Sequence, residues 1–453
     1  MPEQKNYTPA FINLTMLFFM WGFMTSLNDI LIPYLKGVFE LTYLKSMLVQ
    51  FAFFIAYFVG SLIYFLISIT KGDPINKLGY KKGIIIGLIV SALGAFLFYP
   101  AAQFHAYGFF LSALFVLGLG FTLLQISANP YVSILGSEQS SASRLNLAQG
   151  FNSLGTTLAP VVGGFLIFSF FKESAGSDAV KIPYLIFGFL FLAMALFIQK
   201  IKLPRFTNSE DIVKGFGAFK YNQLVFGMIA IFMYVGGEVS VGSMIINFLN
   251  LPEIGGLNET EASLYVSFYW GGQMIGRFMG AISLSTDQKP LTKYLLMFLV
   301  SVVSFLAVGL LVDFGTASIY AILLAANFIA FILGKSMPNK TLYIFALINI
   351  ALLISVISNT GTIAIWSLVG IGLFNSIMWS NIFTLSIGGL GKYTSQGSSL
   401  LVMMILGGAL LPLLMGYTAD QYGVQMSFAI PIISYLYLAF YGIKGYKPNL
   451  IKE

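Results

Sequence analysis

The sequence contains no cysteine, only one histidine and few charged residues. Of its 453 residues, 9% are Asp, Glu, Lys or Arg, against about 25% in a typical soluble domain. Without cysteine the chain can form neither a disulfide nor a thiolate metal site, and a single histidine, His105, removes most zinc and catalytic-triad chemistry. Hydrophobic residues make up 58% of the chain. This composition excludes a soluble enzyme and a nucleic-acid-binding protein, so we expect no nucleic-acid partner.

The sequence also lacks the common motifs of hydrolytic enzymes. It contains no Walker A, HExxH or GxSxG motif, so nothing in it indicates ATP hydrolysis or proteolysis. A membrane enzyme that acts on a lipid-linked sugar would need a polar catalytic loop, but the longest loops have about twenty residues and no paired-acid constellation. We therefore predict that the protein is not an enzyme.

What the sequence has in abundance is apolar runs of membrane-spanning length. The first run contains Asn28 and Asp29 and has no cleavage site, so we interpret it as a retained span and not as a signal peptide. We predict an all-α polytopic protein of the lipid bilayer. Its fourteen spans lie near residues 10–34, 45–70, 83–100, 106–135, 145–171, 182–200, 222–249, 262–284, 291–312, 317–334, 341–358, 361–388, 397–416 and 424–443.

The basic residues lie mostly on one side of these spans. With the N-terminus in the cytoplasm, only Lys36, Lys45, Lys172 and Lys181 of the 24 Lys and Arg residues fall outside, and Arg277 lies within a span. This asymmetry follows the positive-inside rule and predicts that both termini are cytoplasmic. The formal net charge of +7 therefore needs no acidic partner.

An internal repeat relates the two halves of the chain. Gly155 and Pro160 recur as Gly407 and Pro412, at an offset of 252 residues, whereas Phe19-Met20-Trp21 is echoed by Phe232-Met233-Tyr234 at an offset of 213. The two offsets differ by about the length of one helical hairpin. We therefore predict two six-helix bundles, with an extra hairpin inserted in the second between about residues 285 and 360.

The longest polar interruption supports the same division. It runs from residue 203 to residue 221 and separates an N-terminal bundle, residues 1–202, from a C-terminal bundle, residues 222–453. We interpret 203–221 as a cytoplasmic linker. Parallel six-span repeats are the plan of major facilitator transporters.

Three charged side chains are predicted to lie within the membrane, where an ionised group costs at least about 2.5 to 3.5 kcal/mol and usually serves a function. The first is Asp29, which follows Thr25, Ser26 and Asn28. A carboxylate among such oxygens can take up a proton, coordinate Na⁺ or accept hydrogen bonds from a sugar. The alternative is an acid near the outer mouth that reaches water. We predict a cation-coupling site of Asp29, Asn28 and Thr25, with Asp29 as the Na⁺ ligand.

The other two charges are Glu238 and Arg277. Glu238 lies in the seventh span and joins the predicted cation-coupling residues, although an ion pair with Arg277 would equally satisfy both charges. Trp270, Gln273 and Arg277 are spaced to share one helix face, so ring, amide and guanidinium form a plausible sugar platform. The alternative for Arg277 is a helix-end anchor at the cytoplasmic boundary.

Two pairs of amides are candidates for binding sugar hydroxyls. Gln125 and Asn129 are four residues apart in the fourth span, and Gln149 and Asn152 are three apart in the fifth, so each pair presents two amides on one face. Amides offer both donors and acceptors, which a polyhydroxylated ligand requires. Singly, each could instead hold helices together, at roughly 0.6 kcal/mol.

Four longer runs resemble a known transporter family. They are NDILIPYLK from Asn28, LQISANPYVSILG from Leu124, RLNLAQGFNSLG from Arg144 and GLFNSIMWSNIFTLSIGGLG from Gly372, and the loop at Gly79 is similar to the degenerate superfamily signature between spans two and three. Together they resemble the fucose:proton symporter family of the major facilitator superfamily, and the LQxxANPY form resembles its glucose/galactose branch.

The resemblance implies secondary active sugar uptake by alternating access. It implies that Asp29 is the essential first-span carboxylate and that Gln149 and Asn152 contact sugar; we add Asn375 to the predicted sugar-binding residues. Two departures matter. The fucose branch has a glutamate where this chain has Gln125, and a glutamine where it has Glu238.

We therefore predict a hexose symporter for glucose, galactose or mannose-type sugars. Na⁺ is favoured over H⁺ as the coupling cation, because a carboxylate amid oxygens can bind Na⁺ without a second titrating group. Proton-coupled symport, or an exporter or flippase of amphiphiles, are the alternatives. We expect no cofactor besides the co-transported ion, a monomer, and a place in the bacterial cytoplasmic (inner) membrane.

Overall fold

The computed structural model describes residues 8–71, 74–135, 141–170, 176–201, 203–204, 217–284, 289–311, 314–390 and 393–448. Every regular element in these residues is a helix. Most of the predicted linker, residues 205–216, and the loop residues Gly72 and Asp73 lie outside the described residues. The boundaries predicted for the two bundles and the linker therefore stay predictions.

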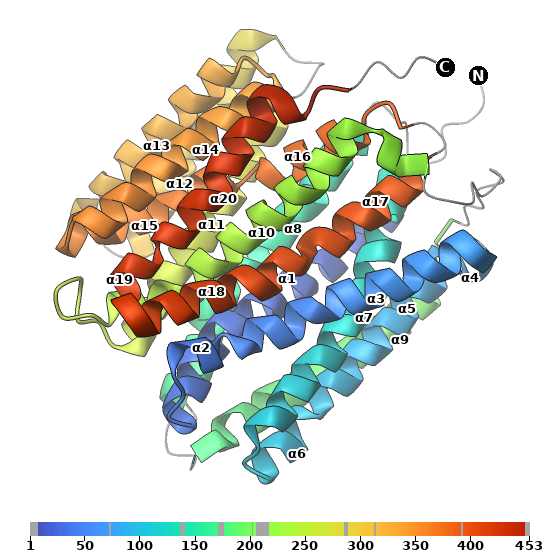
Figure 1. The fold of residues 1–453 in the computed structure, drawn as a ribbon, viewed down its shortest axis with the longest axis horizontal. Coiled ribbons are helices and arrows are strands. Elements are labelled where there is room, and N and C mark those ends of the chain that lie inside the picture. The colour runs from blue at the N-terminus through green and yellow to red at the C-terminus, as the bar shows by residue number, and fades with distance from the viewer. Residues whose placement is uncertain are drawn as a thin grey trace.

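The first half of the chain, residues 8–204, forms the spans expected from its hydropathy (Figure 1). Short helices extend several of these spans at their ends. The elements are α1 (Thr8–Val38), α2 (Tyr43–Ser46), α3 (Leu48–Lys71), α4 (Pro74–Leu78), α5 (Tyr80–Phe96), α6 (Phe98–Gln103), α7 (Tyr107–Ile134), α8 (Ser141–Gly164), the π-helix η2 (Phe165–Phe170), the 3₁₀-helix η3 (Gly176–Val180) and α9 (Lys181–Lys200).

The second half, residues 217–448, contains more helices. Two of its spans are interrupted, one between α15 and α16 and one at the 3₁₀ turn η6. The elements are η4 (Gly217–Lys220), α10 (Asn222–Leu249), α11 (Glu259–Ser283), α12 (Pro290–Leu311), α13 (Phe314–Gly334), α14 (Pro338–Ser358), α15 (Gly361–Asn375), α16 (Met378–Ile387), α17 (Thr394–Met403), η6 (Met404–Leu406), α18 (Gly407–Tyr422), α19 (Val424–Ser427), α20 (Ala429–Phe440) and the π-helix η7 (Tyr441–Gly445).

Thirteen helices in the described part of the chain are long and apolar enough to cross a membrane. They coincide with thirteen of the fourteen predicted spans. The fourteenth, α11, has 25 residues but is less apolar, because it contains Glu259, Glu261, Gln273 and Arg277. The all-helical, polytopic fold class is confirmed.

Glycines at equivalent positions join the helices of the two halves in the same way. A Cβ atom on Gly155 of α8 would collide with the carbonyl oxygen of Phe19 in α1, and a Cβ on Gly407 of α18 would collide with that of Phe232 in α10. Only glycine allows backbones to approach this closely. In the predicted repeat Phe19 corresponds to Phe232, and Gly155 corresponds to Gly407. The sequence repeat therefore reproduces the same crossing of two helices in each half.

The helix contacts also identify the inserted hairpin. In the first half α5 packs against α7 and α9, and in the second half α14 packs against α15 and α20 in the same way. Helices α12 and α13 have no counterpart and lie at the edge of the molecule (Figure 1). The exposed side of α12 is apolar, with Leu310 79% and Leu291 69% exposed, as expected of a face toward lipid. By these contacts the extra hairpin consists of α12 and α13, residues 290–334.

The two halves meet at the end of the molecule opposite both termini, where Figure 1 shows α2, α6 and α19. There the Asp420 carboxylate, at the end of α18, accepts hydrogen bonds from the backbone N–H groups of Tyr43 (2.8 Å) and Leu44 (2.9 Å) in the first turn of α2. A carboxylate at a helix N-terminus is favoured by the unpaired N–H groups and the helix dipole. This contact joins the two halves across the predicted outer face.

Candidate functional site: a polar cavity between the two halves

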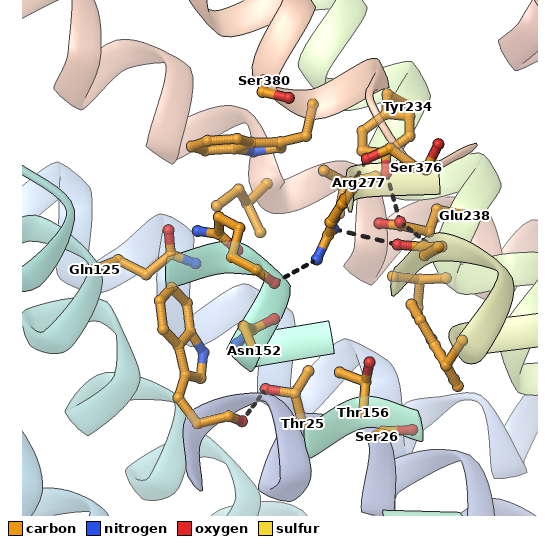
Figure 2. A pocket seen from close by; sticks show the side chains of 18 of the residues that line it. Thr25, Ser26, Gln125, Asn152, Thr156, Tyr234, Glu238, Arg277, Ser376 and Ser380 are labelled. Atoms are coloured by element: carbon orange, nitrogen blue, oxygen red, sulfur yellow. Dashed lines mark hydrogen bonds between the residues drawn. The ribbon is translucent and has the colours of Figure 1, made fainter. Parts of the chain in front are cut away.

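A cavity of about 130 Å³ lies between the two halves of the chain (Figure 2). Its wall contains amides, hydroxyls, one acid, one guanidinium and several aromatic rings. It is lined by Trp21, Thr25, Ser26, Phe54, Tyr57, Gln125, Gln149, Asn152, Thr156, Tyr234, Val235, Glu238, Val239, Trp270, Gln273, Arg277, Ser376, Trp379, Ser380 and Ile405. Three of the four tryptophans of the chain are among them.

Glu238 is held in this wall by two short hydrogen bonds. The Tyr234 hydroxyl lies 2.5 Å and the Gln273 Nε2 atom 2.6 Å from its Oε1 atom. The other end of the Gln273 amide accepts a hydrogen bond from Arg277 Nη2 (3.2 Å). Gln273 therefore lies between acid and guanidinium, and within the described residues Glu238 and Arg277 form no direct ion pair.

Arg277 connects this acidic side of the cavity to the first half of the chain. Its Nη1 atom donates to the Ser153 hydroxyl and to the Gln149 carbonyl (3.3 Å), both in α8. Its Nε atom donates to the Ser376 carbonyl (3.2 Å). Figure 2 shows the guanidinium pointing into the cavity, so Arg277 is not the helix-end anchor that its sequence position also allowed.

Asp29 lies behind the cavity wall and is only 4% exposed. It does not line the cavity, although Thr25, one turn earlier in α1, does. Trp270 Nε1 donates to Asp29 Oδ2 (2.9 Å), and Gln50 Nε2 donates to Asp29 Oδ1 (3.1 Å) and lies 2.9 Å from Ser243 Oγ. Trp270 and Ser243 belong to the second half, so the contacts around this carboxylate link both halves. Its low exposure shows that it is buried and not an acid at an open mouth.

Three side chains close to Asp29 in the sequence or bound to it carry a buried oxygen that has no hydrogen-bond partner among the described residues. The atoms are Ser26 Oγ, Asn28 Oδ1 and Gln50 Oε1. Ser26 and Asn28 precede Asp29 in α1, and Gln50 binds it directly. Each unsatisfied buried polar atom costs about 1 to 3 kcal/mol, so these oxygens are available for a ligand. Asn28 is completely buried, whereas Thr25 donates its hydroxyl hydrogen to the Trp21 carbonyl (2.9 Å).

The predicted amide pairs form a connected row on the first half. Asn129 Nδ2 lies 3.4 Å from Gln125 Oε1, and Gln149 Nε2 lies 3.5 Å from Asn129 Oδ1. Gln125, Gln149 and Asn152 line the cavity, but Asn129 stands behind them and does not. Asn152 also donates to the Phe18 carbonyl (3.0 Å). Three of these four side chains could therefore contact a ligand directly.

Asn375 is not where a sugar contact would lie. Its side chain is completely buried within the second half and does not line the cavity. Asn349 (2.9 Å) and Tyr435 (2.8 Å) donate to Asn375 Oδ1, and Asn375 Nδ2 donates to Tyr269 (2.9 Å). Asn375 is the last residue of α15, and the break that follows turns Ser376 to the cavity instead. Of the predicted sugar-binding residues, Asn375 is therefore placed in the packing of the second half and not in the cavity wall.

Sequence reasoning missed most of the aromatic wall. Trp21 and Tyr234 are counterparts in the repeat at the offset of 213, and both line the cavity. Their equivalent positions in the repeat could have identified both rings as cavity residues from the sequence alone. Tyr57, Thr156 and Trp379 also line it, and nothing in their local sequence distinguishes them from other membrane residues.

Two helical bundles that enclose a polar cavity of this kind define a secondary transporter. The chain belongs to the Major Facilitator Superfamily, whose sequence profile matches residues 12–341. Within it, the expected place in the glucose/galactose branch of the fucose:proton symporter family is confirmed by relatives that match nearly the whole chain.

The "Glucose/galactose transporter" of Brucella abortus (strain 9-941) is 45% identical over 451 residues, which cover 98% of this chain and 96% of the relative. The "Putative glucose/galactose transporter" of Helicobacter pylori (strain ATCC 700392 / 26695) is 36% identical and covers 98% of both chains. The "L-fucose-proton symporter" of Escherichia coli (strain K12) is 31% identical, covering 93% of this chain and 89% of the relative. Among solved structures, FucP in the outward conformation matches with a TM-score of 0.68 and 29% identity, covering 97% of this chain and 99% of that one. These relatives are transporters and not enzymes.

Proposed function

We propose that this protein is a cation-coupled hexose symporter that works by alternating access. The observation that carries the proposal is Asp29, a buried carboxylate that side chains of both halves hold beside a polar cavity. A cation that binds there can change the contact between the halves, and coupling requires such a differential interaction.

The cavity wall supports a sugar as the substrate. Gln125, Gln149 and Asn152 offer amide donors and acceptors from the first half, and the second half offers the Glu238 carboxylate as an acceptor and the Gln273 amide. Three tryptophan rings line the same cavity. Each presents an apolar body with a polar tip to a ligand. Two relatives are named glucose/galactose transporters, which favours those hexoses.

For the coupling cation we propose Na⁺, with H⁺ as the second candidate. The buried oxygens of Ser26 and Asn28, which precede Asp29 in α1, and of Gln50, which donates to it, have no partner among the described residues. They support Na⁺, because hard cations prefer oxygen ligands. The relatives whose names state an ion favour H⁺, since they are called fucose-proton symporters. The described residues contain no group of three or more His, Cys, Asp or Glu side chains suited to a metal ion.

Uptake by proteoliposomes tests the function and the ion together. We expect labelled glucose or galactose to accumulate when an inward Na⁺ gradient is imposed without a pH gradient. Accumulation with a pH gradient alone would assign H⁺ instead. Equal uptake without either gradient would contradict coupling, and failure of every hexose to exchange would contradict the sugar assignment and leave an exporter of amphiphiles.

Alternating access also makes a prediction for Asp420. Because its carboxylate joins α18 to the first turn of α2, Asp420→Asn should weaken closure at this end severalfold. The chain has no cysteine, so a single Val239→Cys change places one thiol in the cavity wall. We expect its labelling by a membrane-impermeant reagent, added on the α2 side, to become severalfold faster.

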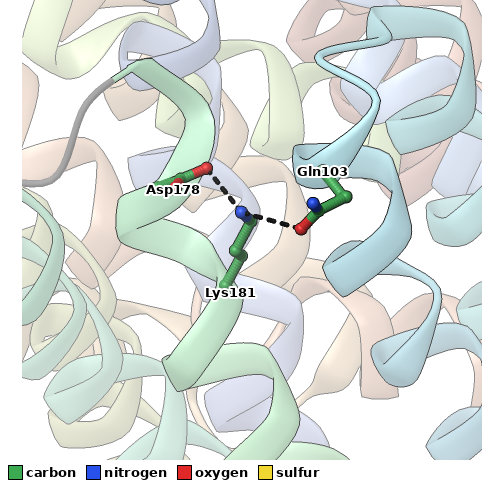
Figure 3. A network of polar contacts seen from close by, with 3 residues as sticks. All are labelled: Gln103, Asp178 and Lys181. Atoms are coloured by element: carbon green, nitrogen blue, oxygen red, sulfur yellow. Dashed lines mark hydrogen bonds and ion pairs between the residues drawn. The ribbon is translucent and has the colours of Figure 1, made fainter.

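Asp178→Asn is the matched control for this measurement. Asp178 pairs with Lys181 (2.8 Å), which also lies 3.3 Å from Gln103, so all three partners belong to the first half (Figure 3). The control removes one carboxylate without touching the contact between halves, and labelling should stay as it is in the parent protein. Equal labelling in both variants would show that Asp420 does not hold this end closed.

Gln125 gives a test of the sugar site itself. Losing a buried hydrogen-bond partner costs about 1 to 3 kcal/mol, or between about five- and 150-fold in affinity. Gln125→Ala should therefore weaken hexose binding at least about fivefold in counterflow while cation dependence stays intact. The control is Gln223→Ala. Gln223 is a buried amide in the first turn of α10 that binds the Gly388 carbonyl (3.2 Å) and does not line the cavity, so its loss should leave hexose affinity unchanged. Unchanged affinity in Gln125→Ala would mean that this amide only joins helices.

A further inference from the structure

The inserted hairpin places one buried amide against the main bundle. Helix α13 turns Ala317, Tyr320, Leu324, Asn327 and Phe331 inward, at the three- and four-residue spacing of one helix face. Asn327 is the only amide on this face and is completely buried. The other four residues would pack an apolar hairpin onto the bundle without it.

The Asn327 amide binds the end of α15. Its Nδ2 atom donates to the Leu373 carbonyl (3.2 Å), which also accepts a hydrogen bond from the Ser376 hydroxyl (2.8 Å). Two residues further on α15 ends, and α16 begins at Met378. Asn327 therefore acts on the last turn before the helix is interrupted.

Other helices hold the same interruption from different sides. The Tyr234 hydroxyl of α10, which is bound to Glu238, also lies 3.1 Å from the Asn375 carbonyl oxygen, and Arg277 of α11 donates to the Ser376 carbonyl. A Cβ on Gly276 of α11 would collide with the Ser376 side chain. The interruption is thus held between α10 and α11 of the bundle and α13 of the hairpin.

The interrupted segment carries part of the cavity wall. Ser376, Trp379 and Ser380 line the cavity within one turn of the break. Leu373 is three residues before Ser376 in the chain, so a displacement of its carbonyl would also displace the backbone that carries these side chains. The contact made by Asn327 is therefore one helix turn away from the proposed sugar site.

Packing alone does not explain Asn327. Its Oδ1 atom is buried and has no hydrogen-bond partner in the part of the chain that the structure describes, which costs free energy that a leucine at this position would avoid. We therefore look for the role of Asn327 in the hydrogen bond that its Nδ2 atom donates. Here the donor reaches a backbone carbonyl next to the cavity.

We propose that Asn327 is a positioning residue, through which the inserted hairpin holds the break between α15 and α16 in the sugar-binding arrangement. The inference rests on the proposed hexose site and extends it to a helix pair that lies outside the two six-helix bundles. It assigns the hairpin a role in substrate affinity and none in cation coupling, since the side chains that donate to Asp29 belong to α3 and α11.

Asn327→Leu tests the proposal in the full-length protein, with Ser304→Ala as the control. Ser304 donates to the Val300 carbonyl (2.7 Å) within α12, so its loss removes a hydrogen bond from the hairpin without altering its contact with α15. We expect Asn327→Leu to weaken glucose or galactose binding about fivefold or more, the factor for one lost hydrogen bond. The control should bind as the parent does, and the dependence on cation should be the same in all three proteins.

The melting temperature separates positioning from stability. The proposal expects Asn327→Leu to lose affinity while melting within a few degrees of the parent protein. Unchanged affinity overturns it, and so does a loss of affinity that follows a loss of melting temperature in both Asn327→Leu and a second variant, Asn327→Ala. The two variants together keep the test decisive where one folds poorly.

A second measurement needs no sugar and distinguishes this inference from the proposed function. Trp379 lies in the segment that Asn327 positions, and its emission can be taken as the difference between a protein and its Trp379→Phe variant. We expect Asn327→Leu to shift this emission and Ser304→Ala to leave it unchanged. If the parent protein binds no hexose, the proposed function fails, but this shift still decides whether Asn327 positions the break; its absence overturns the inference.

Discussion

Asp29→Asn should abolish cation-driven accumulation of sugar and bring the ratio of internal to external hexose down to about one, the value for an uncoupled carrier. The substitution keeps the size of the side chain but removes its charge, so a cation no longer gains by binding there. Exchange of hexose across the membrane should survive, because Asp29 lies behind the cavity wall and does not line it. Accumulation and exchange measured on the same proteoliposomes check both expectations.

Trp270→Phe is the control for the lost contact between the halves. In Asp29→Asn only one of the two side-chain atoms can still accept a hydrogen bond, so the bond from Trp270 or from Gln50 is lost together with the charge. Trp270→Phe removes the same bond and leaves the carboxylate. Cation dependence should persist in it, although hexose affinity should fall. Full gradient-driven accumulation in Asp29→Asn would exclude Asp29 as the coupling site and favour Glu238.

Glu238→Gln should lower hexose transport by two orders of magnitude or more. Removing one partner of a directly paired buried charge costs about 3 to 5 kcal/mol, because the other charge is left uncompensated. We expect a comparable loss here, although Glu238 and Arg277 are joined through Gln273 and not directly. Here Gln273 transmits the effect, since its amide faces Glu238 with its nitrogen and Arg277 with its oxygen. Glu253→Gln, in an exposed loop, makes the same change of charge and should have little effect.

A double variant shows whether acid and guanidinium act as one unit. If they do, Glu238→Gln combined with Arg277→Gln should transport better than the product of the two single effects predicts, because no lone charge remains. If the two residues act independently, the loss of transport rate in the double variant should equal the product of the two single losses. That result, or a wild-type transport rate in Glu238→Gln, would contradict the link through Gln273.

The fold was predictable because membrane spans are a local property of the sequence. A helix needs about twenty apolar residues to cross a bilayer, and each such run can be found without knowing its neighbours. The errors lie at the ends: the first span was predicted to end at residue 34, but α1 continues through Pro33 to Val38. Helix ends outside the bilayer depend on capping and packing, which hydropathy does not report.

The site was less predictable because it depends on contacts between distant parts of the chain. Asp29 could be recognised as a buried charge, but its partners Gln50 and Trp270 are 21 and 241 residues away. Asn375 was expected to bind sugar, but it ends α15, and the interruption that follows turns Ser376 to the cavity instead. A local pattern gives the face on which a residue lies, and an interruption changes that face.

The two glycine crossings bear on the history of the chain. Gly155 against Phe19 and Gly407 against Phe232 are the same joint in two places, as duplication of an ancestral six-helix unit would leave. Among the described residues the pair α12 and α13 occurs in the second half alone and so stands outside this repeat. Asn327 therefore belongs to a pair of helices that the duplicated plan does not account for, although it acts on a helix interruption that lies within that plan.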